Sequence, residues 1–301
     1  MKDKILRAFE RADKLKIAFI GETIIDEYRY VKVLGKSSKE SILSVVDTDE
    51  PAEIFEGGVI AASKHGEFAN VEVYTDIGQH VRITRYLDID SKSKLFVTHS
   101  RQQMPSRDFN DVEADIAVIL DFGYGLINTR TPGVAFLPKI KFHAVNVQTS
   151  AANYGFNLFT KYKSAVDFLC VNIGEARLGL RMQHEHYDMV AKRIGACAKR
   201  TIITMGKLGC IVINSKPPPG VYNLSAHDIK HVPAVAKSSV DTVGAGDSFI
   251  AVTAPLIAAG LELEAAALVG NIVAAIKINI LGHRRHVTRD EIIEYIKEIL
   301  K

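Results

Sequence analysis

The chain has 301 residues, of which 47% are hydrophobic and 24% charged, and its formal net charge is +3. This composition is typical of a globular protein, and because charges of both signs are interspersed, it gives no indication of nucleic-acid binding. The three cysteines are odd in number and lack metal-ligand spacing, which favours reduced thiols in a cytoplasmic protein over a disulfide framework.

The first predicted elements are a helix and a strand. Ile5, Phe9 and Ala12 recur at helical spacing in a segment that is charged throughout, so it predicts an amphipathic helix rather than a secretory signal. Residues 15–21 form a β-branched and aromatic run ending at glycine, the pattern of a buried strand. No segment is apolar over a sufficient length to span a bilayer, so no membrane insertion is expected.

The next part of the chain predicts a lid. Residues 28–46 alternate in the manner of exposed antiparallel strands, and residues 85–98 do so again. Between them, Gly57 and Gly58 open an alanine-rich helix over 59–69, which is followed by a strand at 71–75. This order predicts a βαβ unit with an inserted hairpin, and the lid is placed at about 27–54 and 85–105 of a single domain covering 1–301.

Regular alternation of strands and helices then predicts an α/β fold with a mostly parallel central sheet between helical layers. A further strand at 210–214 is expected to pair antiparallel at the edge of this sheet. The predicted strands are 116–121, 144–148, 168–172 and 201–205, and the predicted helices are 174–181, 187–199, 263–280 and 289–300.

Polar side chains follow the ends of the predicted strands. In an open parallel sheet the ligand crevice lies beyond the carboxyl ends of the strands. One such residue could be a helix cap or a turn former, but five together favour a binding site. They are Asp26, Asp121, Gln148, Asn172 and Thr204.

A glycine-rich stretch, Asp241-Thr-Val-Gly-Ala-Gly-Asp247, opens directly into an apolar helix over about 250–259. The unpaired N–H groups and the dipole of such a helix N-terminus attract anions. Asp247 could be an ordinary first-turn residue, or it could accept a proton from a hydroxyl that attacks a phosphorus bound at those N–H groups. The stretch lacks the third glycine of a dinucleotide-binding fingerprint, and the chain contains no Walker-type phosphate loop.

Three other groups have both a structural and a functional interpretation. Asn172 and Glu175 have the spacing of a capping box, and they could also hold Mg²⁺ through water molecules. His184 and His186 could bind a metal, but a solvated helix face is favoured there. The segment from His283 to His286 could contact a phosphate or form a charged surface turn.

The stretch Asp241–Asp247 resembles the D-T-x-G-A-G-D signature of the ribokinase-like (PfkB) carbohydrate kinases. This resemblance implies a ribokinase-like three-layer αβα sandwich with a small β-lid. It also implies ATP-dependent phosphorylation of a sugar hydroxyl, with Asp247 as the base and the N–H groups of Gly244, Ala245 and Gly246 as the anion hole. It further implies that Asp241 helps to bind a monovalent cation such as K⁺, as in some family members.

Other motifs of the same family match residue by residue. Asn172 and Glu175 match its N-x-x-E motif near Mg²⁺ and phosphate, and Gly57 and Gly58 match its first signature. Asp26 matches an aspartate that binds substrate hydroxyls. Thr204, Gly206 and Gly209 match the T-x-G-x-x-G segment of the ATP site, and Asn271 resembles a residue of the helix beside the adenine.

Three further patches are similar to the heptose-phosphate kinase branch of the family. They are Gly21 to Tyr28, Asp121 to Ile127 and Asn146 to Asn157. This likeness implies a sugar-phosphate substrate, and the predicted substrate contacts are Asp26, Gly57, Gly58, Asp121 and Gln148. In the family as a whole a projecting lid often pairs with a second copy, which implies a homodimer through the lid.

Three departures from the family pattern keep two alternatives open. Ala61 and Ala62 stand where an asparagine is usual, the segment between Gly78 and Arg85 is short, and Pro255 interrupts the helix after Asp247. The alternatives are a nucleotide- or sugar-phosphate-binding protein of the same fold with impaired catalysis, and a nucleoside kinase.

Overall fold

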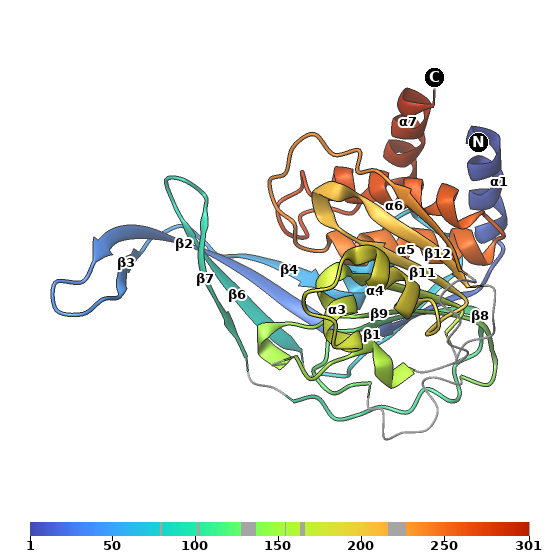
Figure 1. The fold of residues 1–301 in the computed structure, drawn as a ribbon. Coiled ribbons are helices and arrows are strands. Elements are labelled where there is room, and N and C mark those ends of the chain that lie inside the picture. The colour runs from blue at the N-terminus through green and yellow to red at the C-terminus, as the bar shows by residue number, and fades with distance from the viewer. Residues whose placement is uncertain are drawn as a thin grey trace.

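The structure is a computed structural model that describes residues 1–78, 80–100, 103–127, 137–153, 155–162, 166–215 and 227–300. Within these residues the chain forms one large sheet covered by helices and a second sheet that projects from it (Figure 1).

The central sheet has eight described strands in the order β13-β12-β11-β10-β9-β8-β1-β5. All neighbours from β5 to β11 run parallel, and β12 and β13 are antiparallel additions. The strands are β1 (Ile17–Gly21), β5 (Val71–Tyr74), β8 (Ala114–Asp121), β9 (Ile140–Val147), β10 (Phe168–Asn172), β11 (Arg200–Thr204), β12 (Cys210–Ser215) and β13 (His227–Val232). The predicted α/β fold with a mostly parallel sheet is confirmed.

The pairing of β12 was predicted, but its place at the edge of the sheet was wrong. β12 pairs antiparallel with β11, with Thr204 opposite Cys210, and β13 covers its other side. In β13 only Ile229 and Val232 are aliphatic. An edge strand has one neighbour and needs few apolar residues, so the hydrophobic pattern of β13 was too weak to predict a strand.

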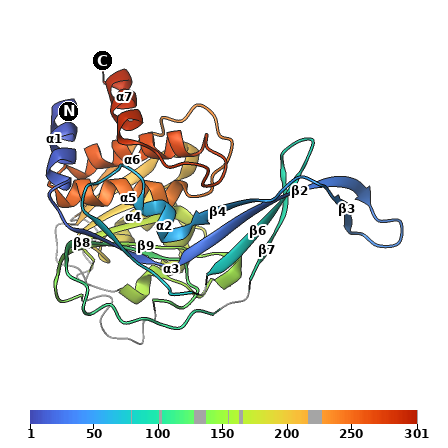
Figure 2. The ribbon, with the colours of Figure 1, turned by 180° about the vertical axis from the view of Figure 1, so that it is seen from behind.

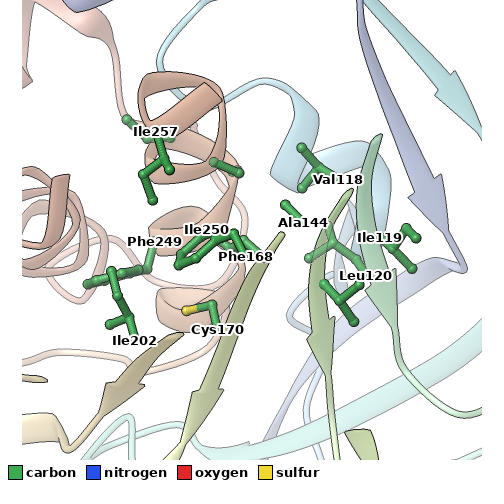
Figure 3. Packing of buried hydrophobic residues seen from close by; sticks show 14 of the residues in the cluster. Val118, Ile119, Leu120, Ala144, Phe168, Cys170, Ile202, Phe249, Ile250 and Ile257 are labelled. Carbon is green, nitrogen blue, oxygen red and sulfur yellow. The ribbon is translucent and has the colours of Figure 1, made fainter. Parts of the chain in front are cut away.

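Helices cover the central sheet because its strands are apolar on both faces, as the fully buried β1 illustrates. In α5, Phe249 and Ile250 lie against Phe168, Cys170 and Ile202 of β10 and β11 (Figure 3). The helices are α1 (Lys2–Ala12), α2 (Gly58–Ser63), α3 (Ile173–Leu180), α4 (Tyr187–Ile194), α5 (Ala245–Ala258), α6 (Leu263–Lys277) and α7 (Arg289–Ile299). Both ends of the chain lie together, in α1 and α7 (Figure 2).

The second sheet contains the first segment that the sequence assigns to the lid, and the second segment as far as His99. It has the order β3-β2-β6-β7, with β4 paired to the root of β2. Its strands are β2 (Thr23–Lys36), β3 (Leu43–Asp47), β4 (Glu53–Gly57), β6 (Val81–Asp88) and β7 (Lys94–His99). Figures 1 and 2 show it extending as an arm from the body of the molecule. Residues 101–102 of the predicted lid lie outside the described residues.

Three helices are shorter than predicted, and another passes through a proline. The helix α2 ends at Ser63, and Gly66 then takes a positive φ of 76°, a conformation that a helix cannot continue. The helix α4 ends at Ile194 rather than at 199, and α6 ends at Lys277 rather than at 280. By contrast, α5 continues through Pro255 to Ala258. In the part of the chain that the structure describes, no helix combines the length and the apolar character needed to cross a membrane.

Candidate active site

A cavity of about 390 Å³ lies where the carboxyl ends of β9, β10 and β11 meet the N-terminus of α5 and the root of the second sheet. Most of the residues predicted for the site line this cavity, although they are far apart in the sequence. They are Asp26, Gly58, Gln148, Asn172, Glu175, Thr204, Gly244, Ala245, Gly246 and Asp247.

The N-terminus of α5 faces this cavity. Gly244 caps the helix in the left-handed conformation with a φ of 74°, and no side chain caps the helix N–H groups. The N–H of Ala245 lies 3.3 Å from the carbonyl oxygen of Thr242. The N-terminal N–H groups and the helix dipole together make this end of the cavity suited to a phosphate group.

The Asp247 carboxylate lies in the first turn of α5 and is only 7% exposed. Its Oδ1 accepts a hydrogen bond of 2.6 Å from Nε2 of Gln148, which immediately follows β9. Burial raises the pKa of Asp247 to about 6, although His283, Gln148 and Lys277 favour its ionised form. A carboxylate that titrates near neutrality at a helix end suited to a phosphate group can act as a general base.

The capping-box interpretation of Asn172 and Glu175 is confirmed. The Asn172 side chain accepts from the Glu175 N–H at 2.9 Å, and the Glu175 carboxylate accepts from the Asn172 N–H at 2.8 Å. Both residues nevertheless line the cavity. Burial raises the pKa of Glu175 to about 7, and the nearby charge of Asp247 also raises it.

This corner of the cavity has the chemical character of a divalent-cation site. The two buried carboxylates repel each other, and Oδ1 of Asn146, which lines the same cavity, has no hydrogen-bond partner within the part of the chain that the structure describes. Mg²⁺ prefers oxygen ligands and keeps several of its waters. Among the described residues, no three His, Cys, Asp or Glu side chains converge on one point, so these residues fit an ion held partly through water.

The part of the cavity wall that His283 joins to the N-terminus of α5 is built around Asp26 in β2. Its carboxylate contacts the Arg85 guanidinium of β6 and lies 3.2 Å from Nε2 of His283. Burial raises the pKa of Asp26, but the hydrogen bonds and charges of His283 and Arg85 outweigh burial and hold it below its usual range. Gly57 lies directly beside them, because a Cβ there would come within 2.3 Å of the Asp26 carboxylate.

Asp121 does not line the cavity, although the sequence assigns it to the substrate. Its carboxylate is 1% exposed and accepts hydrogen bonds from Tyr162 at 2.5 Å and from Asn157 at 3.1 Å. Lys161 also contacts it. This arrangement gives Asp121 a supporting position beneath the loops that carry Gln148 and Asn153.

The predicted nucleotide residues are spread along the edge near β11. Thr204 lines the cavity, whereas Gly206 and Gly209 form the turn between β11 and β12. The Asn271 side chain donates to the carbonyl oxygens of Val232 and Pro233 at 3.3 and 2.9 Å, which ties α6 to the end of β13. His186 caps α4 at an exposed position, in agreement with the favoured structural interpretation.

Asp241 is bound by donors from four parts of the fold, one of which is the Tyr28 hydroxyl of β2, 3.3 Å from Oδ2. Its Oδ1 accepts from Lys94 at 2.5 Å and from the Val243 N–H at 3.0 Å, and its Oδ2 accepts from the Gly282 N–H at 3.0 Å. Burial raises the pKa of Asp241, but these donors outweigh burial and lower it to about 2. A monovalent cation at Asp241 remains a prediction.

Three residues of the site were not predicted from the sequence. Asn146 could have been found, because a period of two places it on the same face of β9 as Gln148. For Lys277, the only signal in the sequence was a charged residue within an otherwise apolar helix. Nothing in the sequence distinguishes Arg85 from the other charged residues of its alternating strand.

The two glycines of the signature loop are expected to differ in their tolerance of alanine. A Cβ on Gly244 would lie 2.8 Å from His283 and require an unfavourable positive φ, whereas nothing lies within 4 Å of a Cβ on Gly246. We expect Gly244→Ala to lower the free energy of unfolding by about 1–2 kcal/mol or more, and Gly246→Ala to leave it nearly unchanged. Denaturant unfolding of both variants measures this, and equal losses would contradict the loop geometry.

Comparison with known proteins places these features in a family context. Residues 140–286 match the model of the pfkB family carbohydrate kinases. The bifunctional protein HldE of Shewanella sp. (strain MR-4) is 24% identical over 328 residues, covering 96% of this chain and 64% of the relative. The chain therefore spans less than two thirds of the length of that relative.

Solved structures of ribokinases share the fold. The ribokinase of Thermotoga maritima superposes with a TM-score of 0.71 at 16% identity, over 94% of this chain and 99% of the other. The ribokinase of Arabidopsis thaliana, solved with ribose and ATP, has a TM-score of 0.65 at 14% identity, over 94% and 99% of the two chains. The predicted ribokinase-like fold is confirmed.

Proposed function

This chain is a ribokinase-like relative of the pfkB family carbohydrate kinases, and we propose that it transfers the γ-phosphoryl group of ATP to a hydroxyl group of a sugar or sugar phosphate. The observation that carries the proposal is the position of Asp247. This buried carboxylate lies in the first turn of an uncapped helix, in the same cavity as Asp26 and Gln148. A carboxylate at an anion-binding helix end has a chemical reason to be there if it removes a proton from the acceptor.

The proposed reaction is an in-line displacement at phosphorus. Asp247 accepts the proton of the acceptor hydroxyl while that oxygen bonds to the γ-phosphorus, and the bond from the γ-phosphorus to the oxygen of ADP breaks. Gln148 orients the Asp247 carboxylate through its 2.6 Å hydrogen bond. The N–H groups of Gly244, Ala245 and Gly246 stabilise the charge on the transferred phosphoryl oxygens.

ATP is proposed to lie along the β10 and β11 side of the cavity, near Asn172 and Thr204, with Gly206, Gly209 and Asn271 further along that edge. Asn146 and Glu175 would hold Mg²⁺, with Asn172 contributing through water. When bound there, the ion would neutralise charge on the β- and γ-phosphates.

A phosphorylated sugar is the acceptor class that the cavity wall around Asp26 favours. Arg85 and His283 place two cationic or polar donors around Asp26, so this part of the cavity can bind both hydroxyl groups and an anionic group. A neutral nucleoside would leave the guanidinium without a ligand phosphate. The similarity to HldE supports a heptose phosphate as the first compound to test.

A homodimer through the second sheet is also proposed, since this sheet exposes many apolar side chains. Exposed apolar clusters on soluble proteins mark interaction surfaces. The exposed residues are Leu34, Ile42, Leu43, Val46, Ile54, Phe96 and Val97.

The direct test of the function is ADP release from Mg·ATP over a panel of sugars, sugar phosphates and nucleosides. We expect turnover with a phosphorylated sugar and at least tenfold lower kcat/KM with its unphosphorylated form. Saturable ATP binding without turnover on any member would favour the non-catalytic binding protein. Preference for a nucleoside would contradict the role given to Arg85.

The pH dependence of kcat/KM should report the ionisation of Asp247. Its pKa is raised to about 6, so the carboxylate is the dominant form above pH 6 and the protonated, inactive form dominates below it. We therefore expect kcat/KM to fall about tenfold per pH unit below pH 6 and to level off above it. Glu175→Gln removes a neighbouring negative charge, so the acidic limb should remain and move slightly below pH 6. If that variant loses the limb, Glu175 rather than Asp247 is the titrating group.

A further inference from the structure

Lys277, near the end of α6, is a fully buried lysine that touches the signature loop. Its side chain lies in a helix that is otherwise largely apolar, and its exposure is 0%. Its Nζ donates to the carbonyl oxygen of Val243 at 2.8 Å and to that of Gly282 at 2.7 Å. Val243 immediately precedes Gly244, and Gly282 immediately precedes His283, so one ammonium group joins the anion-binding loop to the turn that contacts Asp26.

Asp241 binds the same two residues from their N–H sides. The N–H groups of Val243 and Gly282 both donate to its carboxylate at 3.0 Å. Thus a carboxylate holds both N–H groups and an ammonium holds both carbonyl groups of two peptide segments that lie far apart in the sequence. This paired arrangement fixes the backbone immediately before the N-terminus of α5.

The ammonium of Lys277 is surrounded by two carbonyl oxygens and by the charges of three carboxylates. Burial holds the pKa of Lys277 below its usual value, and the charge of Lys94 also lowers it, while the carboxylates of Asp241, Asp247 and Asp26 offset part of this shift. A buried ammonium is stable only where carbonyl oxygens and opposite charges replace its water. Carbonyl oxygens next to a carboxylate are also what K⁺ or NH₄⁺ would require, and here the ammonium of Lys277 already occupies that position.

We propose that Lys277 is the resident cation of the signature loop and replaces the monovalent ion predicted at Asp241. The proposal rests on the proposed kinase function and deepens it. Lys277 is a positioning residue, since it holds the carbonyl groups of Val243 and Gly282 so that the N–H groups of the following loop face the cavity. Lys94, which contacts Asp241 from β7, occupies the other side of the carboxylate. The site therefore needs no K⁺.

The test compares Lys277→Ala with Lys277→Met while NH₄Cl or KCl replaces choline chloride at constant ionic strength. Alanine leaves space for an ion beside the two carbonyl groups, whereas methionine fills the space without a charge. We expect the wild-type protein to show the same melting temperature and the same kcat in all three salts. Lys277→Ala should lose at least tenfold in kcat and regain at least fivefold with NH₄⁺, with a saturable rise in melting temperature, and Lys277→Met should regain neither.

The matched control is Lys199→Ala, which removes a lysine from its 2.6 Å contact with Asp167 at the opposite end of the sheet. Its melting temperature should not respond specifically to NH₄⁺. The proposal would be overturned if K⁺ raised the kcat of the wild-type protein severalfold or its melting temperature by several degrees. It would also be overturned if a folded Lys277→Ala protein showed no change in kcat or melting temperature with either NH₄⁺ or K⁺. If Lys277→Ala does not fold in any salt, the wild-type titrations decide. Melting temperatures are measured without substrate, so they test this proposal even if no kinase activity is found.

Discussion

Replacing Asp247 with asparagine is expected to reduce kcat by about 10²–10⁴-fold, the range that a general base contributes. Asparagine has nearly the same shape and keeps an oxygen that can accept the hydrogen bond from Gln148, but it cannot take a proton from the acceptor hydroxyl. ATP binding should change little, because the backbone N–H groups at the N-terminus of α5 remain. The measurement is the rate of ADP release alongside a direct titration of ATP binding.

The matched control for this substitution is Asp167→Asn. Asp167 lies just before β10, at the end of the sheet away from the cavity, where it contacts Lys199 and the His143 N–H. Losing this carboxylate should lower stability but leave kcat within about twofold of the wild-type value. A modest loss of kcat in Asp247→Asn, equal to that of the control, would remove Asp247 from the role of base.

The parts of the site that could be predicted are those coded by consecutive residues. The sequence from Asp241 to Asp247 fixes a turn, a helix start and a carboxylate within seven residues, so its local structure follows from the motif itself. The residues at strand ends could also be predicted, because apolar runs mark the strands and the sheet brings their carboxyl ends together. Gln148, Asn172 and Thr204 were placed at the cavity in this way.

The partners of these residues could not be predicted, because they depend on tertiary packing between distant segments. Asp26 meets Arg85 only because β2 and β6 pair in parallel, with Tyr28 opposite Arg85. Lys277 reaches Val243 only because α6 packs against α5. Hydrophobic periodicity relates residues within one helix or strand, so it cannot predict either of these contacts between distant segments. In a single sequence, a lysine in an apolar helix is equally consistent with a helix end that reaches solvent.

Asp26→Asn is expected to raise the KM for the sugar by about 10- to 100-fold while leaving ATP binding unchanged. A hydrogen bond to a charged group contributes about 1.5–3 kcal/mol, and Asp26 lines the same cavity as Asp247. The substitution also leaves the Arg85 guanidinium without its buried counter-charge, so the melting temperature should fall. Steady-state kinetics with varied sugar and varied ATP separate the effects on the two substrates.

Glu27→Gln is the control that separates substrate binding from the stability of the second sheet. Glu27 follows Asp26 in β2 and is similarly buried, but its carboxylate points to the other face, where it contacts Arg29, Arg82 and Thr84. Both variants remove one buried charge from the same strand, and both should lower the melting temperature. Only Asp26→Asn should raise the KM for the sugar, because only Asp26 lines the cavity. An equal rise in both variants would mean that the second sheet as a whole, rather than the Asp26 carboxylate, determines sugar affinity.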